Sequence, residues 1–432
     1  MTLLFRRADE MRLLVWVAAL VATGSVAVAA AEATSFDRRQ LLIPVVFVAL
    51  AVALHAFLAI RRVRGDQLLL PLASALTAIG LVLMQRLQPD DTPLLAQQLT
   101  WMIVACGAFA ATMLIPRDLT TIGRFKWMWA LLGVALLVSP LLPVIGREIN
   151  GARIWVGLGR FNFAPWEAVK ILMVVFFAAY LEEYREVIAR PRRIGPIPVP
   201  PVPYLLPMLA MWAIAMAIVV FEKDLGAALL FLGIFLAMLY LATGEAFYSL
   251  IGIALVALGG YVLYQTFGHV QVRVDTWLDP FHEEMRFGAG YQIIQGLFAL
   301  GNGGLFGAGL GNGMPHRIPI VWSDFVFDAF AEEAGLAGAI ALLALYLVFV
   351  YRGMLIAIKA PTPFLQLLAA GLSFIIAFQT LVIVGGNLRL IPLTGVTLPF
   401  VAYGGSSLVT NWMLVALLIR VSDITARVRG TP

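Results

Sequence analysis

Twelve runs of about 20 predominantly apolar residues take up most of this chain. A run of this length can cross the hydrocarbon core of a bilayer as a helix. Because lipid offers the backbone no hydrogen-bond partners, each run must satisfy its own N–H and C=O groups, which favours helices. The runs cover residues 11–32, 41–60, 67–87, 97–115, 126–144, 164–181, 204–221, 225–242, 246–266, 324–350, 364–386 and 398–420. The sequence therefore predicts an all-α polytopic membrane protein with no separate soluble domain.

The composition excludes several other classes of protein. Apolar residues make up 61% of the chain and charged residues only 13%, whereas a soluble domain usually carries about 25% charge. In a membrane protein the net charge of +5 reflects cations gathered in cytoplasmic loops, so we expect membrane lipid and no nucleic acid as a partner. The single cysteine, Cys106, permits no intrachain disulfide, and the histidines lack metal-ligand spacing.

The distribution of cations predicts the orientation of the chain. If the N-terminus is cytoplasmic, the inside segments hold most of the arginines and lysines, and the outside segment 88–96 holds none. This bias predicts that both termini lie in the cytoplasm. The small residues at 26–33 also suit a signal-peptide cleavage site. We favour a retained helix, because the apolar run is longer than a normal signal core.

Two connecting segments differ from the rest. Residues 185–203 form a basic, proline-rich inside loop, which predicts a stiff linker or a contact with anionic lipid headgroups. Residues 267–323 form the longest loop, which lies outside and contains an amphipathic stretch, 291–300, followed by a glycine-rich run. Long loops in compact proteins are usually functional or disordered, so we expect this one to be partly ordered and functional.

Ionisable residues in or beside apolar helices are the most informative polar groups, since they are costly in lipid. Glu167 and Lys170 lie three residues apart and can pair on one helix face. The pair predicts either a structural ion pair or a polar wall of a substrate cavity. The turn at Glu222 to Asp224 has the composition of an ordinary charged hairpin tip.

An acidic stripe opens the tenth apolar run, where Asp324, Asp328 and Glu332 recur every four residues. The helix dipole explains a carboxylate at the first position, but not the continuation of the stripe into the membrane. Such carboxylates predict a general base, a cation site or a proton path. Arginines of the outside segments, among them Arg153 and Arg389, are suited to bind phosphate through their planar donor fork.

Six short motifs in order resemble the SEDS family of cell-wall proteins, which includes FtsW and RodA. They are GARIW at 151–155, PWEAVK at 165–170, KDLGAA at 223–228, YQIIQ with GNGG at 291–304, SDFVF with EE at 323–333, and TGVTLPF with YGGSS at 394–407. The sequence departs from the family pattern at Trp166, Lys223, Asn302 and Ala402. The family core has ten spans, so the resemblance implies a ten-helix core at 66–432 and two extra N-terminal helices at 1–65.

The resemblance implies a peptidoglycan glycosyltransferase that polymerises lipid II at the outer face of the bacterial cytoplasmic membrane. It identifies Asp324 as the catalytic base of an inverting displacement. The family usually has a small or apolar residue at the position of Asp328, so a divalent-cation site for Mg²⁺ or Mn²⁺ at Asp324 and Asp328 is inferred from the acidic stripe and not from the resemblance. No organic cofactor is implied. The implied substrate-binding residues are Arg153, Glu167, Lys170, Asp224, Gln292, Gln295, Arg389, Ser406 and Ser407.

The family also implies a partner, a class B penicillin-binding protein that cross-links the product as a transpeptidase. Two alternatives remain open from the sequence: a lipid II flippase and a non-catalytic scaffold for a transpeptidase. Charges gathered at the outer face argue against a flippase, because alternating access favours a site near the midplane. The sequence does not distinguish a role in elongation from one in division.

Overall fold

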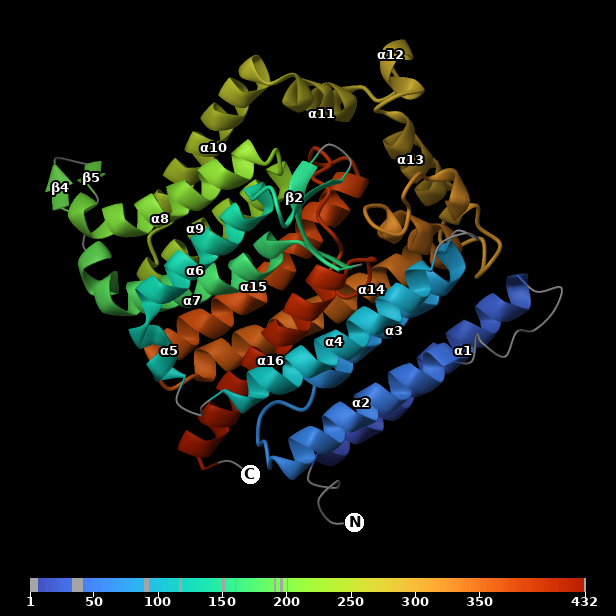
Figure 1. Cartoon of the computed structure of the whole chain (residues 1–432), viewed down its shortest axis with the longest axis horizontal. Coiled ribbons are helices and arrows are strands. Elements are labelled where there is room, and N and C mark those ends of the chain that lie inside the picture. Colours follow the sequence, from blue (N-terminus) through green and yellow to red (C-terminus); the bar gives the residue numbers. More distant parts are fainter. Residues whose placement is uncertain are drawn as a thin grey trace. The chain divides into compact units, whose positions relative to one another are not determined.

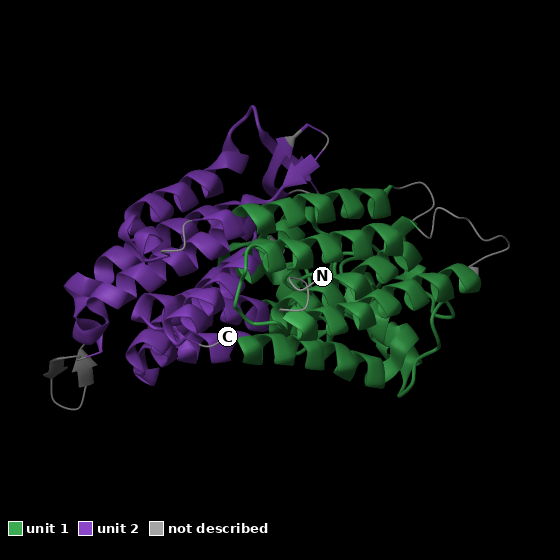
Figure 2. Cartoon of the chain, turned by 90° about the horizontal axis from the view of Figure 1, so that it is seen from below, with its two compact units in different colours: residues 1–111, 261–352, 379–415 green, residues 112–260, 353–378, 416–432 purple. Residues whose placement is uncertain are grey.

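The computed structural model describes residues 7–32, 42–88, 93–115, 119–149, 152–159, 161–189, 192–194, 197–199 and 201–430. The chain divides into two compact units, each built from discontinuous segments and coloured separately in Figure 2. Unit 1 contains residues 1–111, 261–352 and 379–415, and unit 2 contains residues 112–260, 353–378 and 416–432.

Unit 1 is made of helices. Its elements are α1 (Ala8–Glu32), α2 (Leu42–Ile60), α3 (Leu69–Leu87), α4 (Leu94–Leu114), α11 (Gly268–Leu278), α12 (Glu283–Arg286), α13 (Tyr291–Gly303), the 3₁₀ turn η4 (Pro315–Arg317) and most of α14 (Val326–Lys359). It also includes one end each of α10 (Ala246–Thr266), α15 (Pro363–Asn387) and α16 (Gly405–Val428), while the last residues of α4 belong to unit 2.

Unit 2 contains the other helices and all the strands of the described residues. Its elements are α5 (Thr120–Arg124), α6 (Lys126–Val138), the 3₁₀ turn η3 (Ser139–Leu141), β1 (Gly146–Ile149), β2 (Ala152–Leu158), β3 (Phe161–Phe163), α7 (Pro165–Ile188), β4 (Arg192–Ile194), β5 (Ile197–Val199), α8 (Val202–Phe221), α9 (Leu225–Thr243) and most of α10 (Ala246–Thr266). The remaining parts of α14, α15 and α16 complete it.

The predicted all-α membrane architecture is confirmed, with ten described helices long and apolar enough to span a bilayer rather than the twelve expected. The other two predicted runs are helical but differ in kind. The helix α7 is long enough but carries several charged residues. The apolar helix of the 126–144 run ends at Leu141, because Pro140 in the 3₁₀ turn has no N–H with which to continue it. The chain is thus a multi-pass membrane protein.

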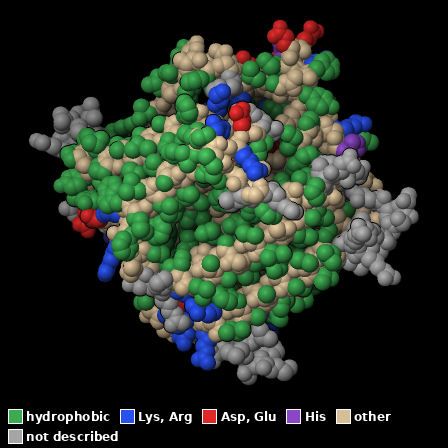
Figure 3. Space-filling view, in the orientation of Figure 1, with side chains coloured by type: hydrophobic (Ala, Val, Ile, Leu, Met, Phe, Trp, Pro, Cys, Tyr) green, Lys and Arg blue, Asp and Glu red, His purple; other side chains and the backbone are tan. Residues whose placement is uncertain are grey.

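The surface of the molecule suits lipid. Hydrophobic side chains cover most of the face shown in Figure 3, and charged groups gather in a few places. Large apolar residues are left exposed along the membrane helices; the Trp16 side chain is 74% exposed and that of Leu347 is 69% exposed. A soluble protein rarely exposes apolar area on this scale, whereas lipid tails cover it without cost.

A small antiparallel sheet precedes α7, in the connecting segment between the predicted apolar runs 126–144 and 164–181. Its strand order is β1-β2-β3, and β2 is visible in Figure 1. Residues 154–156 (Ile-Trp-Val) favour a strand, since β-branched and aromatic side chains pack well on a pleated surface. Arg147 fixes the sheet by donating to Asn162 Oδ1 (3.0 Å) and to the Gly159 carbonyl (2.7 Å).

The N-terminal hairpin of α1 and α2 is joined to the rest of unit 1 by buried charges, and α1 packs along α3 (Figure 1). The Arg7 guanidinium pairs with Glu10 at 2.5 Å and donates to the carbonyls of Val63 and Gly65. The second Glu10 oxygen accepts from His55 Nδ1 at 2.7 Å. Because one partner of a buried pair cannot be removed without leaving a charge unpaired, this network fixes how α1 meets the turn before α3.

Candidate functional site

A break in α14 is filled by another segment of unit 1. Gly335 has φ +70° and ψ −175° inside the helix, a conformation open to glycine but strained for other residues. The glycine-rich segment after α13 packs into this break: Ala308 N donates to the Glu332 carbonyl, and Leu336 N donates to the Gly304 carbonyl. These hydrogen bonds therefore satisfy backbone groups at the interruption of the helix.

An ion pair fastens the same segment to α3. Arg86 Nε lies 2.9 Å from Glu333 Oε1, and its Nη2 donates to the carbonyls of Gly311 and Gly313. The other Glu333 oxygen accepts from Gly311 N at 3.1 Å. Glu333, the second glutamate of the EE pair, thus has a structural role. Its neighbour Glu332 accepts a hydrogen bond from Asn302 at 3.5 Å.

Asp324 lies in the turn that leads into α14, two residues before its first helical residue, and is half-buried. Its Oδ1 accepts from the Ser323 hydroxyl at 2.9 Å. Burial raises the pKa of the Asp324 carboxyl above its usual range, while the Ser323 hydroxyl and the charge of Arg273 act in the opposite direction. A carboxylate with a raised pKa is a stronger base.

Asp328 differs from Asp324 in its position, its exposure to solvent and its hydrogen bonding. It lies within the first turn of α14, its side chain is 0% exposed, and neither oxygen has a hydrogen-bond partner in the structure. The helix α13 covers it: a Cβ atom on Gly296 would approach Asp328 Oδ2 to 2.9 Å. The predicted acidic stripe therefore begins outside the helix and becomes fully buried after one turn.

The predicted substrate-binding residues of α13 lie on a helix that packs against this acidic turn. Gln292 Nε2 donates to the Pro319 carbonyl at 2.6 Å, which anchors α13 to the loop before Asp324. Gln295 is half-buried on the same helix. The amphipathic stretch expected at 291–300 is confirmed as a helix, and its Gly296 allows the close approach to Phe325 and Asp328.

Arg389 contacts backbone rather than presenting its whole fork to an anion. Its Nε donates to the Trp277 carbonyl at 2.6 Å and its Nη2 donates to the Leu278 carbonyl, which caps the last turn of α11. Trp277 Nε1 returns a hydrogen bond to the Arg389 carbonyl at 3.1 Å. Arg389 thus holds α11 in place, and phosphate binding by this residue stays a prediction.

Ser406 and Ser407 are buried at the start of α16. Ser407 Oγ accepts from Thr397 Oγ1 at 3.0 Å and from Asn411 Nδ2 at 3.2 Å. Glycine at position 405 allows α16 to lie close to α4, because a Cβ atom on Gly405 would lie 2.1 Å from the Trp101 ring. The helix begins at Gly405 rather than at residue 398, and the hydrogen bonds of Ser407 stabilise its first turn. Contact of Ser406 and Ser407 with substrate stays a prediction.

In unit 2, Glu167 and Lys170 form the predicted pair near the start of α7. Lys170 Nζ lies 2.5 Å from Glu167 Oε2, and both side chains are almost fully buried. Pro165 occupies the first helical position, which suits its fixed φ. Arg153 is exposed on β2, so its guanidinium is open to an anion at the sheet.

Asp224 caps the N-terminus of α9, where its side chain accepts from Ala227 N at 2.9 Å. This contact explains an acid at that position without a substrate, so the predicted binding role is left without structural support. Its neighbour Glu222 is buried and carries an unpartnered oxygen. Burial, and then the charge of Asp224, raise the pKa of Glu222 to about 8, so the hairpin tip is not the ordinary solvated turn that its composition predicts.

Glu222→Gln is expected to raise the melting temperature in detergent at pH 8 and to have little effect near pH 4. The folded protein holds the Glu222 proton up to about pH 8, whereas the unfolded chain releases it near pH 4.5. Folding is therefore penalised progressively as pH rises through this window, and the amide removes the penalty. The measurement is thermal unfolding of both proteins across pH 4–9, with Glu245→Gln at an exposed position as control. A gain independent of pH would contradict the assignment.

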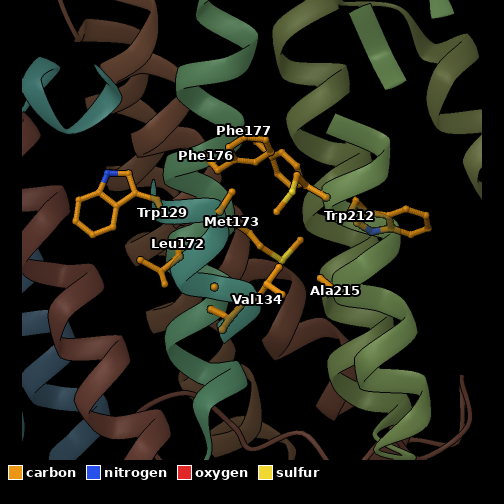
Figure 4. Close-up of a pocket in the computed structure, with 12 residues that line it drawn as sticks. Trp129, Val134, Leu172, Met173, Phe176, Phe177, Trp212 and Ala215 are labelled. Atoms are coloured by element: carbon orange, nitrogen blue, oxygen red, sulfur yellow. The ribbon is translucent and has the colours of Figure 1, made fainter. Parts of the chain in front are cut away.

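Two of the apolar cavities among the described residues lie in unit 2. One, of about 20 Å³, lies among α6, α7 and α8, where Figure 4 shows Met173, Phe176 and Trp212 around it. The other is a groove of about 400 Å³ lined by side chains from α9 and α10 and by Met354, Phe374 and Phe378. The larger groove has room for hydrocarbon.

The predicted divalent cation can be tested against the donor set. Asp328 supplies two buried oxygens without partners, which suits a hard cation that prefers oxygen ligands. Over the described residues no group of three or more His, Cys, Asp or Glu side chains is placed to hold a metal. An ion at Asp324 and Asp328 would thus take its remaining ligands from water or substrate.

Comparison with known proteins places this geometry in context. The model of the cell cycle protein family of FtsW, RodA and SpoVE matches residues 66–427. The chain is 43% identical over 378 residues to the peptidoglycan glycosyltransferase RodA of Mycobacterium tuberculosis, covering 85% of this chain and 80% of that protein. It is 34% identical over 333 residues to the probable peptidoglycan glycosyltransferase FtsW of Pseudomonas fluorescens, covering 76% and 78%.

Solved structures show the same fold. A chain from a peptidoglycan synthase complex, studied for its coordination of polymerisation and crosslinking, matches with a TM-score of 0.68 and 27% identity over 83% of this chain and 98% of that one. The crystal structure of the rod shape determining protein RodA of Thermus thermophilus matches with a TM-score of 0.57 and 26% identity over 83% and 97%.

Proposed function

Because the chain belongs to the FtsW, RodA and SpoVE family, we propose that it is a peptidoglycan glycosyltransferase that polymerises lipid II at the outer face of the bacterial cytoplasmic membrane, with both termini inside. One observation carries the site of the reaction: Asp324 is a half-buried carboxylate with a raised pKa at the mouth of a membrane helix. The 43% identity to RodA, against 34% to FtsW, supports a role in cell shape.

The proposed reaction is a single displacement with inversion at the anomeric carbon. The sugar hydroxyl of the acceptor attacks that carbon, its proton passes to Asp324, and the bond to the lipid diphosphate breaks with its electron pair on the leaving oxygen. Such a step needs a base but no covalent nucleophile. Lys170 and the exposed Arg153 are the proposed cations for the substrate, while the apolar groove in unit 2 is proposed to hold part of the polyprenyl tail.

A divalent cation, Mg²⁺ or Mn²⁺, at Asp324 and Asp328 is part of the proposal. When bound, it would supply positive charge beside the diphosphate. The protein is first depleted of metal with a chelator, and Mg²⁺ or Mn²⁺ is then added back while the amount of protein-bound ion is measured, which gives the affinity directly. If Asp328→Asn binds the ion as tightly as the wild type, Asp328 is not a ligand.

Reconstitution of the purified chain in vesicles with fluorescent lipid II tests the function against its alternatives. A polymerase makes glycan strands that are resolved on a gel. Dye movement across the bilayer without glycan indicates a flippase, and neither product nor movement indicates a scaffold. Glycan synthesis is the expected result, and its absence in the presence of the native partner would overturn the proposal.

The proposed partner is a class B penicillin-binding protein, in keeping with the synthase complex whose chain this fold resembles. Glycan strands need cross-linking, and the connecting segments have no room for a transpeptidase domain. Deletion of every such protein from the host cell is expected to lower the activity of this chain in membranes. Full activity in their absence would show that the pairing is wrong.

A further inference from the structure

Arg273 is a charged residue of α11 to which the sequence motifs assign no role. The side chain is half-buried, and its Nη1 atom is shielded from solvent without a hydrogen-bond partner in the structure. Most buried polar groups in folded proteins are hydrogen-bonded, and a guanidinium N–H left bare is costly. An unpartnered donor of this kind indicates a place for an acceptor that arrives with a ligand.

The helix that carries Arg273 is held in place on two sides. Trp277 and Arg389 exchange hydrogen bonds that lock its last turn, with Arg389 Nε 2.6 Å from the Trp277 carbonyl. Tyr264 OH donates to Asp275 Oδ1 at 3.0 Å, which fixes the register of α11 against the end of α10. A donor presented by a fixed helix loses little entropy when it binds.

Arg273 also acts on the candidate base. Its positive charge stabilises the Asp324 carboxylate, while Asp324 Oδ1 is already engaged by the Ser323 hydroxyl at 2.9 Å. The charge of Arg273 thus acts on Asp324 while its Nη1 atom has no hydrogen-bond partner.

We propose that Arg273 binds a phosphate oxygen of the lipid-linked diphosphate, beside the base that accepts the sugar proton. The inference rests on the proposed function and names the residue that receives the leaving group. As the bond from the anomeric carbon to the diphosphate breaks, its electron pair moves to the phosphate oxygen, and the planar guanidinium stabilises that charge. The proton moves separately, to Asp324.

The test uses the full-length chain in lipid nanodiscs and two probes, undecaprenyl diphosphate and undecaprenol, which differ only in the diphosphate. Arg273→Gln is expected to weaken binding of the diphosphate about 10–100-fold, as for loss of a charge-assisted hydrogen bond, and to leave undecaprenol binding unchanged. Arg273→Lys keeps the charge but not the fork, so an intermediate loss is expected. The matched control is Arg286→Gln, an exposed arginine over the Phe287 ring in the same loop, which is expected to bind as the wild type does.

The outcomes separate this inference from the proposed function. Wild-type diphosphate affinity in both Arg273 variants overturns the inference even if glycan synthesis is normal. Equal loss of both probes shows that the arginine is structural and also overturns it. Selective loss of diphosphate binding upholds the inference, including in the case where the wild-type chain makes no glycan and the polymerase function is wrong.

Discussion

Replacement of Asp324 by asparagine is expected to lower the rate of glycan synthesis by about 10²–10⁴-fold, the usual contribution of a general base. Asparagine keeps the size of the side chain and can still accept from the Ser323 hydroxyl, which lies 2.9 Å from Oδ1, but it cannot take a proton. Membrane insertion and lipid II binding should therefore be normal. Gel-resolved polymerisation of labelled lipid II by the purified variant with its partner is the measurement.

Asp328→Asn provides the comparison. Its carboxyl is fully buried beneath α13, where a sugar hydroxyl does not reach, so partial activity is expected. Asp279→Asn, at an exposed position of the same loop, controls for charge. Near-wild-type product from Asp324→Asn would end the general-base assignment, and an inactive Asp328→Asn beside it would move the base one turn into the helix.

The pH profile of the wild type gives a second test of the same assignment. A base works only when it is unprotonated, and burial raises the pKa of Asp324 above that of an ordinary aspartate. Activity is therefore expected to fall as pH drops through this raised value, earlier than for a solvated aspartate. An acid limb at the ordinary position of aspartate would contradict the burial of the acting base.

Neutralising one member of the Glu167–Lys170 pair is expected to destabilise unit 2 by about 3–5 kcal/mol, because the other charge is left buried. Glu167→Gln and Lys170→Met should both reduce the abundance and melting temperature of the protein. The matched control is the pair of Lys126 on α6 and Glu183 on α7, where Glu183 is 51% exposed and neutralising it should cost about 0–1 kcal/mol.

The double exchange Glu167→Lys with Lys170→Glu separates structure from function. It preserves the ion pair while reversing the field around it, so folding is expected to recover while polymerisation does not. Abundance and melting temperature report the first, and glycan yield per folded protein reports the second. Normal polymerisation by the exchanged protein would make the pair purely structural.

The apolar runs predicted the helices well, because run length and hydropathy are local properties. Their ends were harder. The break in α14 at Gly335 depends on the glycine-rich segment that packs against it, and the start of α16 at Gly405 depends on the Trp101 ring. Neither of these neighbours is close in sequence. The sheet at 146–163 was missed because its strands are only three to seven residues long and pair with one another rather than with a longer sheet.

The candidate site was predictable where chemistry is carried by residue type and position. Asp324, Glu167 and Lys170 stand out as charges in apolar surroundings, and the structure buries the last two as a pair. The capping roles of Asp224 and Arg389 could not be predicted, since a cap is defined by the backbone it meets. Arg273 is one arginine among several in the sequence; only the solvent-shielded Nη1 distinguishes it.

The buried charges at the start of the chain bear on where a shortened version of this protein can begin. The family match starts at Asp66, yet the carbonyl of that residue accepts from Arg7 at 2.8 Å and its carboxylate pairs with Arg352 on α14. A truncation at this boundary would remove the hydrogen bond from Arg7 and would leave the Asp66–Arg352 ion pair at the first residue of the shortened chain. Shortened or fused versions of the protein should therefore keep α1 and α2, because the first residue of the family match is hydrogen-bonded to a residue that precedes it.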